Sequence, residues 1–138
     1  MFDTFEGIPL DGLSGAELNL ANSHNEEIYF DCYDITKNNF REFPNTQLVK
    51  GVIPQSLNTV DIDKVSYLSI DLNNSIAEVS ALEHFWPKLS PSAVVLLDVY
   101  AWQKHETQKY AIDQFAESVG VAVASLPTGQ GLIVKPPV

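Results

Sequence analysis

Cysteine and basic residues are scarce in this chain of 138 residues. Cys32 is its one cysteine, which excludes an internal disulfide, and no Cys/His spacing typical of a structural zinc site occurs. Eight basic residues stand against eighteen acidic ones, for a formal charge of −10, and no two basic residues are adjacent. Nucleic acids and anionic membranes both bind positive surfaces. The composition therefore predicts neither of them as a partner.

Long hydrophobic runs are also missing. The longest, Ala93 to Leu97, is far shorter than the roughly 20 apolar residues of a membrane-spanning helix. The N-terminus lacks the basic and apolar regions of a secretion signal, so we expect a cytoplasmic protein. A chain of this length can bury about two-thirds of its unfolded surface, which predicts one domain over residues 1–138.

The first 25 residues differ from the rest. Residues 1–25 are rich in Gly, Asn, Ser and Asp with little periodicity, which predicts a loop-rich or weakly ordered segment. Residues 26–138 carry the patterns of an α/β core. The first predicted elements there are a helix over Asp34 to Phe43 and a short strand over Thr46 to Val49.

Strands and helices alternate in the later part of the chain. Helices are predicted to begin at Ser75 and at Glu106, and the strands are predicted over Val65 to Ile70, Ala93 to Leu97, Val121 to Ser125 and Gly131 to Val134. This alternation predicts an α/β fold with a mostly parallel sheet and right-handed crossovers. The loop before the last strand is too short for a crossover helix, so that strand is expected to run antiparallel.

Three details sharpen this prediction. Ser75 and Glu78 have the spacing of a capping box, in which each side chain satisfies a free N–H at the start of a helix. Pro87 should end or kink the same helix. The run from Ala93 to Leu97 is apolar without alternation, which is typical of a strand covered on both faces.

Two acids follow predicted strands directly. Asp71 comes after the strand that ends at Ile70, and Asp98 comes after the strand that ends at Leu97. Ligands of open α/β sheets bind at the carboxyl ends of the strands. Converging carboxylates there can hold a divalent cation or act as a general base. The alternative is that each Asp caps the next helix or turn.

His105 is a third candidate, because it precedes a predicted helix on the loop that also carries Asp98. A histidine there could act as a base or a ligand, since its charge changes near neutral pH. A surface histidine at a helix start is the alternative.

Six segments together resemble the class I S-adenosylmethionine-dependent methyltransferases of the macrocin O-methyltransferase type. The resemblance covers nearly the whole chain in the order of the family, and its segments are FDTFEGIP (2–9), LVKGVIPQSL (48–57), KVSYLSIDLNN (64–74), ALEHFWPKLSPSAVVLLDVY (81–100), HETQKYAIDQFA (105–116) and LPTGQGLIVKP (126–136).

The resemblance implies a three-layer Rossmann-like sheet with strand order 3-2-1-4-5-7-6 and an antiparallel seventh strand. Strand 1 and the glycine-rich cofactor loop after it have no counterpart in the sequence, so the resemblance implies a truncated fold. Asp3 matches the acid after strand 2 that accepts hydrogen bonds from the ribose of S-adenosylmethionine. Without the loop, cofactor binding is expected to be very weak.

The resemblance also implies a weakened Mg²⁺ site made by Asp71, Asn73 and Asp98. Asn73 stands where the macrolide enzymes have a second Asp, and Val99 stands where the family has the second acid of an Asp-Asp-Tyr sequence. Fewer ligand charges weaken a site for a hard cation. The resemblance makes Asp71 the residue that orients or deprotonates the acceptor, and His105 a second candidate base.

The function that follows is that of the C-terminal part of an O-methyltransferase acting on a sugar or a similar small hydroxylated acceptor, inactive as this chain alone. One alternative is a non-catalytic interaction or regulatory domain, and another is a binder that uses only the acceptor side of the cleft.

The absence of strand 1 also predicts an open edge on the strand over 65–70. Either the strand over 46–49 moves beside it, giving the order 3-4-5-7-6, or a second copy pairs there and forms a homodimer. The first arrangement leaves residues 2–25 without a sheet to join, so this segment is expected to be displaced from the position it has in the family.

Overall fold

Two sheets form the scaffold of the computed structural model, which describes residues 1–137. The smaller sheet pairs β1 (Phe2–Asp3) with β2 (Val49–Lys50) in parallel. The larger has the order β3-β4-β6-β5, with bounds Val65–Ile70, Leu89–Leu97, Gly131–Val134 and Ala124–Ser125. β3 and β4 are parallel, and β6 is antiparallel to both of its neighbours. The α/β fold class and the antiparallel last strand are therefore confirmed.

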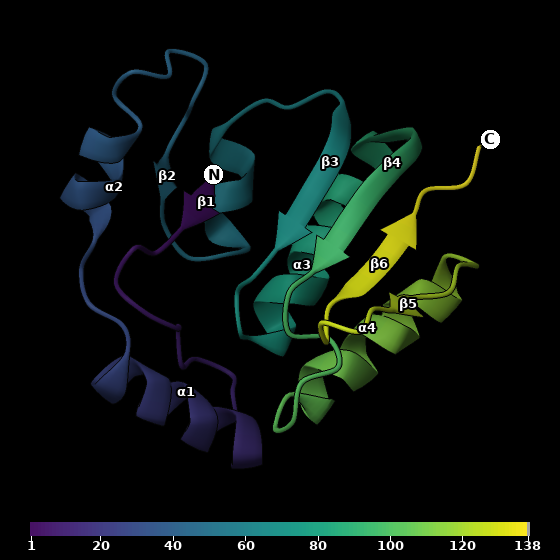
Figure 1. The fold of residues 1–138 in the computed structure, drawn as a ribbon, viewed down its shortest axis with the longest axis horizontal. Helices are drawn as coiled ribbons and strands as arrows, with labels where there is room; N and C mark the ends of the chain where they lie inside the picture. The colour runs from purple at the N-terminus through teal and green to yellow at the C-terminus, as the bar shows by residue number, and fades with distance from the viewer. Residues whose placement is uncertain (138) are drawn as a thin grey trace.

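Four α-helices connect these strands. They are α1 (Gly15–Glu27), α2 (Tyr33–Asn39), α3 (Ser75–Phe85) and α4 (Glu106–Ser118). Two short 3₁₀ helices cover Gln55–Thr59 and Trp86–Lys88. Pro87 ends α3 as predicted, and Gly120 follows α4 with the left-handed φ of 72° that a C-terminal cap requires. Figure 1 shows α3 and α4 behind the larger sheet, α2 beside the smaller sheet and α1 at the bottom of the view.

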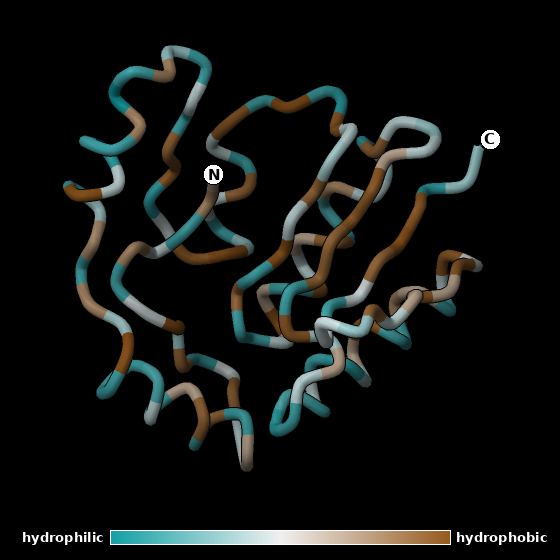
Figure 2. Tube along the Cα trace, in the orientation of Figure 1, coloured by the Kyte–Doolittle hydropathy of each residue, from teal (hydrophilic) through white to brown (hydrophobic). Residues whose placement is uncertain are grey.

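The main core lies between the larger sheet and the pair α3 and α4. Val95, Leu97 and Ile133 point to this side and are at most 1% exposed, and they pack with Leu82 and Ile112 of the two helices. Burying one such side chain contributes about 1.5 to 3 kcal/mol. Apolar residues run along β4 and β6 in Figure 2.

The opposite face of the larger sheet is only partly covered. The residues that alternate with the core positions include Tyr67 and Val134, which are 57% and 51% exposed. Leu96 on the same face is half-buried. The prediction that the run Ala93 to Leu97 is covered on both faces is therefore wrong, because α3 and α4 both pack on one side.

The loop-rich segment predicted over residues 1–25 is also corrected. Phe2 and Asp3 form a strand, and α1 begins at Gly15. The hydrophobic pattern of α1 is weak because its contacts are polar. The carboxylate of Glu17 accepts hydrogen bonds from the backbone N–H and the hydroxyl of Ser75, at 2.6 and 2.9 Å.

The capping box at α3 forms with different partners. Asn74, not Ser75, is the N-cap, and its side chain accepts the N–H of Ala77 at 2.9 Å. Ser75 is engaged by Glu17, and Glu78 accepts the N–H of Asn73 at 3.0 Å. The Ser75 and Glu78 pattern predicted the start of α3 correctly. The hydroxyl of Ser75 binds Glu17 of α1, however, instead of a backbone N–H of its own helix.

The predicted order 3-4-5-7-6 is wrong, because the strand at Val49 pairs with β1 and not with β3. Phe2 therefore stays in a sheet, and the expected displacement of residues 2–25 is wrong for this strand. The ring centroid of Phe2 lies 5.9 Å from that of Phe85 at the end of α3. Within residues 1–137, β1 has only β2 as a neighbour and β3 has only β4, so one edge of each strand is free.

Candidate functional site

The carboxyl ends of β1 and β3 meet at one pocket of about 150 Å³. Asp3, the last residue of β1, and Asp71, the first residue after β3, both line it, as do Asn73, Tyr29 and Cys32. The sequence placed Asp71 and Asn73 in one site, and Asp3 in the cofactor part of the same cleft. The structure brings these three residues together.

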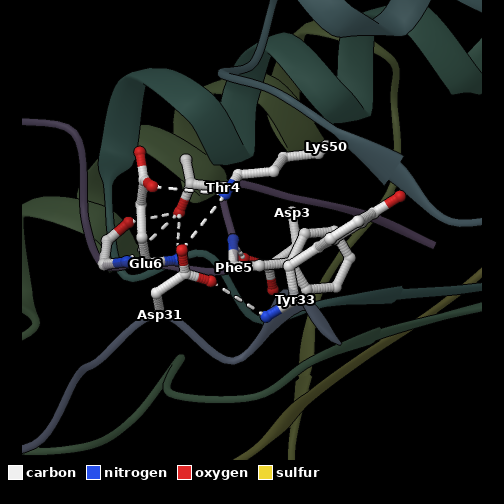
Figure 3. A network of polar contacts seen from close by, with 8 residues as sticks. Asp3, Thr4, Phe5, Glu6, Asp31, Tyr33 and Lys50 are labelled. Carbon is white, nitrogen blue, oxygen red and sulfur yellow. Dashed lines mark hydrogen bonds and ion pairs between the residues drawn. The ribbon is translucent and has the colours of Figure 1, made fainter. Parts of the chain in front are cut away.

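Asp3 is positioned by the loop that follows it, which Figure 3 shows from close by. Its Oδ1 accepts the N–H of Phe5 at 2.7 Å. The hydroxyl of Thr4 donates to the carbonyl of Gly7 at 2.5 Å and accepts the N–H of Gly7 at 3.3 Å. Phe5 has a φ of 60°, in the region that non-glycine residues rarely adopt. These bonds fix a tight turn with the carboxylate of Asp3 at the pocket wall.

Asn25 of α1 ties the next residues of this loop to the helix. Its side chain accepts the N–H of Ile8 at 2.7 Å and donates to the carbonyl of Ile8 at 2.9 Å. A Cβ added to Gly7, which has a φ of 137°, would lie 2.6 Å from Oδ1 of Asn25. Glycine is therefore required at this point of the turn.

Lys50 of β2 closes the outer side of the loop. Its Nζ lies 3.3 Å from Glu6 and 3.6 Å from Asp31, and both contacts are drawn in Figure 3. All three side chains are substantially exposed. Exposed ion pairs contribute about 0 to 1 kcal/mol, so these pairs orient the loop more than they stabilise it.

Asp71 lies among polar groups on the other side of the pocket. Its Oδ1 accepts a hydrogen bond from Nδ2 of Asn73 at 3.2 Å, and the same amide donates to the hydroxyl of Tyr29 at 3.1 Å. Partial desolvation, followed by repulsion from Asp98 and Asp3, raises the pKa of Asp71. A carboxylate with a raised pKa is a better proton acceptor, which suits a general base.

Two buried carboxyl groups support the loop that carries Asp71 and Asn73. Glu17 and Glu78 are 6% and 2% exposed, and both bind backbone groups at the start of α3. Desolvation raises the pKa of Glu78 to about 8. Glu78 is therefore mostly protonated at neutral pH, and its bond to Asn73 holds that residue at its φ of 53°.

Asp98 faces a different set of contacts. Its Oδ1 accepts a hydrogen bond from Nε2 of Gln130 at 2.9 Å, and it is not among the lining residues of the pocket. Val99 is 8% exposed and also lies outside the pocket lining.

The residues predicted to hold Mg²⁺ do not fit a cation in this arrangement. Asn73 turns its amide nitrogen, a donor, toward Asp71. Residues 1–137 contain no group of three His, Cys, Asp or Glu side chains placed to bind a metal ion.

His105 lies apart from the pocket, at the N-cap of α4. It is 5% exposed, its Nδ1 lies 2.8 Å from Nε2 of Gln108, and its ring centroid is 6.4 Å from that of His24. Desolvation and the neighbouring His24 lower its pKa. The structure thus does not bring His105 to Asp71.

No pattern in the sequence indicated Tyr29, Phe30 and Cys32 as pocket residues. They lie in the connection between α1 and α2, which reaches the pocket only because α1 docks through Glu17 and Asn25. Such long-range polar contacts leave no periodic pattern.

Comparison with known proteins identifies the family to which this chain belongs. Residues 1–124 match the macrocin-O-methyltransferase (TylF) family. The solved structure of the O-methyltransferase NovP superposes with a TM-score of 0.82 at 20% identity, over 99% of this chain and 59% of that one. At this identity the likeness shows the fold alone. Among curated proteins, none matches this chain.

The family match and the fold place the chain in the S-adenosylmethionine-dependent methyltransferase-like class. The chain belongs to the macrocin-O-methyltransferase family. It spans about three-fifths of the length of NovP. In residues 1–137, no helix has both the length and the apolar character needed to cross a bilayer.

Proposed function

We propose that this chain supplies the ribose-binding and acceptor-binding part of an S-adenosylmethionine-dependent O-methyltransferase site. The observation that carries the proposal is the convergence of Asp3 and Asp71 on one pocket in a chain of this family. S-adenosylmethionine, when bound, supplies an electrophilic methyl group. The acceptor is a sugar or a similar small molecule with a free hydroxyl.

Asp3 is the proposed ribose ligand. Its Oδ1 is engaged by the N–H of Phe5, which fixes the carboxylate and leaves Oδ2 for a ribose hydroxyl. Hydrogen bonds to an ionised carboxylate are stronger than those between neutral groups.

Asp71 is the proposed base. It is placed to accept the proton of the acceptor hydroxyl, which would make that oxygen a nucleophile toward the methyl group that S-adenosylmethionine would supply. Asn73 and Tyr29 offer hydrogen bonds to other hydroxyls of the acceptor. No step passes through Mg²⁺, because the site residues do not fit it. His105 stays a prediction as a second base, reached only if α4 or its loop moves.

The size of the pocket supports a partial site. Pockets that enclose a small ligand have volumes of about 300 to 1,000 Å³, whereas this one has about 150 Å³. It accommodates part of a nucleoside, so the methionine end needs groups from outside residues 1–137. We propose that this chain alone is inactive.

A titration with adenosine, followed by backbone NMR, tests the ribose site. Shifts are expected at Asp3, Thr4, Tyr29 and Asn73, and Asp3→Asn should abolish them. Asp61→Asn, an exposed site away from the pocket, is the matched control. Unchanged shifts in Asp3→Asn would contradict the assignment. A dissociation constant near 1 µM for S-adenosylmethionine, about 8 kcal/mol of binding, would contradict the need for outside groups.

A non-catalytic methyltransferase-like domain is the second candidate, and the small pocket favours it. A non-catalytic domain predicts that adenosine causes no NMR chemical-shift change at the pocket residues. The homodimer expected at the open edge of β3 stays a prediction, and light scattering at micromolar protein tests it.

A further inference from the structure

Two histidines, far apart in the sequence, join α1 to the start of α4. His24 lies in the last turn of α1, and His105 is the N-cap of α4. Their ring centroids are 6.4 Å apart, and the planes of the two rings are inclined by 37°. α1 and the start of α4 lie next to each other at the bottom of Figure 1. We call His24 and His105 the histidine pair.

The surroundings of His105 oppose a positive charge on its ring. His105 is 5% exposed, and as the N-cap it lies at the positive end of the α4 dipole. Its Nδ1 lies 2.8 Å from Nε2 of Gln108, an amide nitrogen that only donates, so Nδ1 accepts and the ring is neutral in this arrangement. Burial and the neighbouring His24 lower the pKa of His105.

Three groups favour a proton on His105, but none of them is a free counter-ion. The amide of Gln108 would have to turn before its oxygen could accept an N–H from the protonated ring. Glu106 is exposed, so water screens its charge. Glu17 is buried, but both of its oxygens already accept hydrogen bonds from Ser75. The carboxylates that face His105 therefore do not neutralise a charged histidine pair.

Two polar atoms of this cluster are buried without a hydrogen-bond partner within residues 1–137. They are Nδ1 of His24 and Oε1 of Gln108. A buried polar group without a partner lowers the stability of the contact that buries it. The contact is therefore weakly held even with both rings neutral, and repulsion between two protonated rings opposes it further.

His24 also fixes the position of Tyr29, which lines the pocket. The backbone carbonyl of His24 accepts the N–H groups of Ile28 and Tyr29 at 2.9 and 3.0 Å. The ring centroids of His24 and Tyr29 are 6.2 Å apart, in an edge contact. The hydroxyl of Tyr29 accepts a hydrogen bond from Nδ2 of Asn73 at 3.1 Å. A displacement of His24 therefore moves Tyr29 away from Asn73.

We propose that the histidine pair is an acid-sensitive latch on the wall of the pocket. With neutral rings, the pair holds the end of α1 on α4 and keeps Tyr29 at the pocket. Protonation of both rings releases this end of α1. The inference concerns how the pocket is assembled and does not depend on methyl transfer.

The direction of the pH dependence follows from the buried ring. Free histidine has a pKa of about 6.5, and that of His105 is lower in the folded chain. The contact is therefore complete above about pH 6.5. Below that pH it weakens, because the released chain takes up the proton more readily than the docked chain does.

Amide hydrogen exchange at pH 7.5 and pH 5 tests the latch, with each rate divided by the intrinsic exchange rate at that pH. We expect exchange of residues 24–29 to become about tenfold faster at pH 5, the effect of one pKa unit, while β4 stays protected from exchange. Glu78 acts in the opposite direction over this range, because acid protonates its carboxyl group in the unfolded chain.

Variants that cannot take up the proton identify the groups responsible. His105→Asn keeps an oxygen for the amide of Gln108 and a residue type favoured at an N-cap, and His24→Gln keeps a neutral polar side chain. In the double variant, exchange of residues 24–29 should change less than twofold between the two pH values. His84→Asn removes the third histidine of the chain and is the matched control, which should keep the tenfold change.

A histidine NMR titration of the parent chain gives a second measurement. The Cε1–H signal of His105 should titrate at a lower pH in the folded chain than in the urea-unfolded chain, and the ring signals of Tyr29 should shift with the same midpoint. His24→Gln should raise the midpoint of His105, because it removes the neighbouring positive charge.

Three outcomes would overturn the proposal. One is that the normalised exchange of residues 24–29 is the same at both pH values. Another is faster exchange at pH 5 that persists in the double variant, which would assign the effect to a carboxyl group such as Glu17. The third is a midpoint of His105 that is unchanged in His24→Gln, or that Tyr29 does not follow. None of these measurements uses adenosine or S-adenosylmethionine, so the latch and the proposed function fail separately.

Discussion

The N-terminal segment, residues 1–50, and the body formed by residues 65–137 are stabilised in different ways. The body buries a continuous apolar cluster that includes Leu82, Val95 and Ile133, all at most 1% exposed. The N-terminal segment has a cluster of only Ile8, Leu13 and Ala21, with Leu18 packed against it. It is attached to the body by polar contacts, from Glu17 to Ser75 and from Asn74 to the carbonyl of Pro9, and by the ring of Phe2 against Phe85. The pocket lies where the two regions meet, so its shape depends on the weaker of them.

The largest expected effect comes from the core of the body. Leu82→Ala should lower the free energy of unfolding by about 2 to 5 kcal/mol, because it removes a buried side chain and leaves a cavity. Leu13→Ala, the same substitution in the small cluster, should cost about 2 kcal/mol, the low end of that range, because its neighbours can close around it. Urea denaturation measures both. Equal losses would mean that the small cluster is packed as tightly around Leu13 as the core of the body is around Leu82.

The same contrast explains what the sequence could predict. The bounds of β3 and β6 and the first residue of α4 were predicted to the residue, because the hydrophobic pattern of the sequence marks these elements. α1 was missed because its buried positions include Glu17. Asp3, Asp71 and Asn73 were found through strand ends and family resemblance. Tyr29 and Cys32 were not, because only the docking of α1 brings them to the pocket.

The second prediction concerns pH and the boundary between the regions. The pKa of Glu78 is raised from 4.5 to about 8 in the folded chain. Below about pH 4.5 both states are protonated. Between about 4.5 and 8 the unfolded chain loses its proton first, so the free energy of unfolding falls as the pH rises, and above pH 8 the loss is complete.

Glu78→Gln keeps an oxygen for the N–H of Asn73 and removes this titration. The variant should match the parent near pH 4 and exceed its stability by a few kcal/mol at pH 8, on the scale of about 1.4 kcal/mol per pKa unit. Urea denaturation at several pH values measures the difference. Glu83→Gln, an exposed site on the same helix, is the control. A constant difference at every pH would contradict the raised pKa.

The third prediction detaches α1 from the body. Glu17→Ala should leave the N–H and hydroxyl of Ser75 without their partner, at a cost of about 1 to 3 kcal/mol. Amide hydrogen exchange should become faster in α1 and in the connection at Tyr29, while the amides of β4 stay protected from exchange. Glu26→Ala, exposed on the same helix, should change neither region. Acceleration in β4 would show that α1 is part of the cooperative core.

The smallest expected effect is confined to the turn after β1. Thr4→Val keeps the shape of the side chain but removes the hydroxyl that bonds both backbone groups of Gly7. The loss of about 1 kcal/mol corresponds to about fivefold faster exchange of the Gly7 amide. Thr107→Val, on the exposed side of α4, is the matched control and should leave Gly7 unchanged. The melting temperature should stay the same in both variants, because local polar contacts hold this turn while buried apolar contacts hold the body. A melting temperature lowered by several degrees in Thr4→Val alone would instead make the turn, and with it Asp3, an integral part of the stable core.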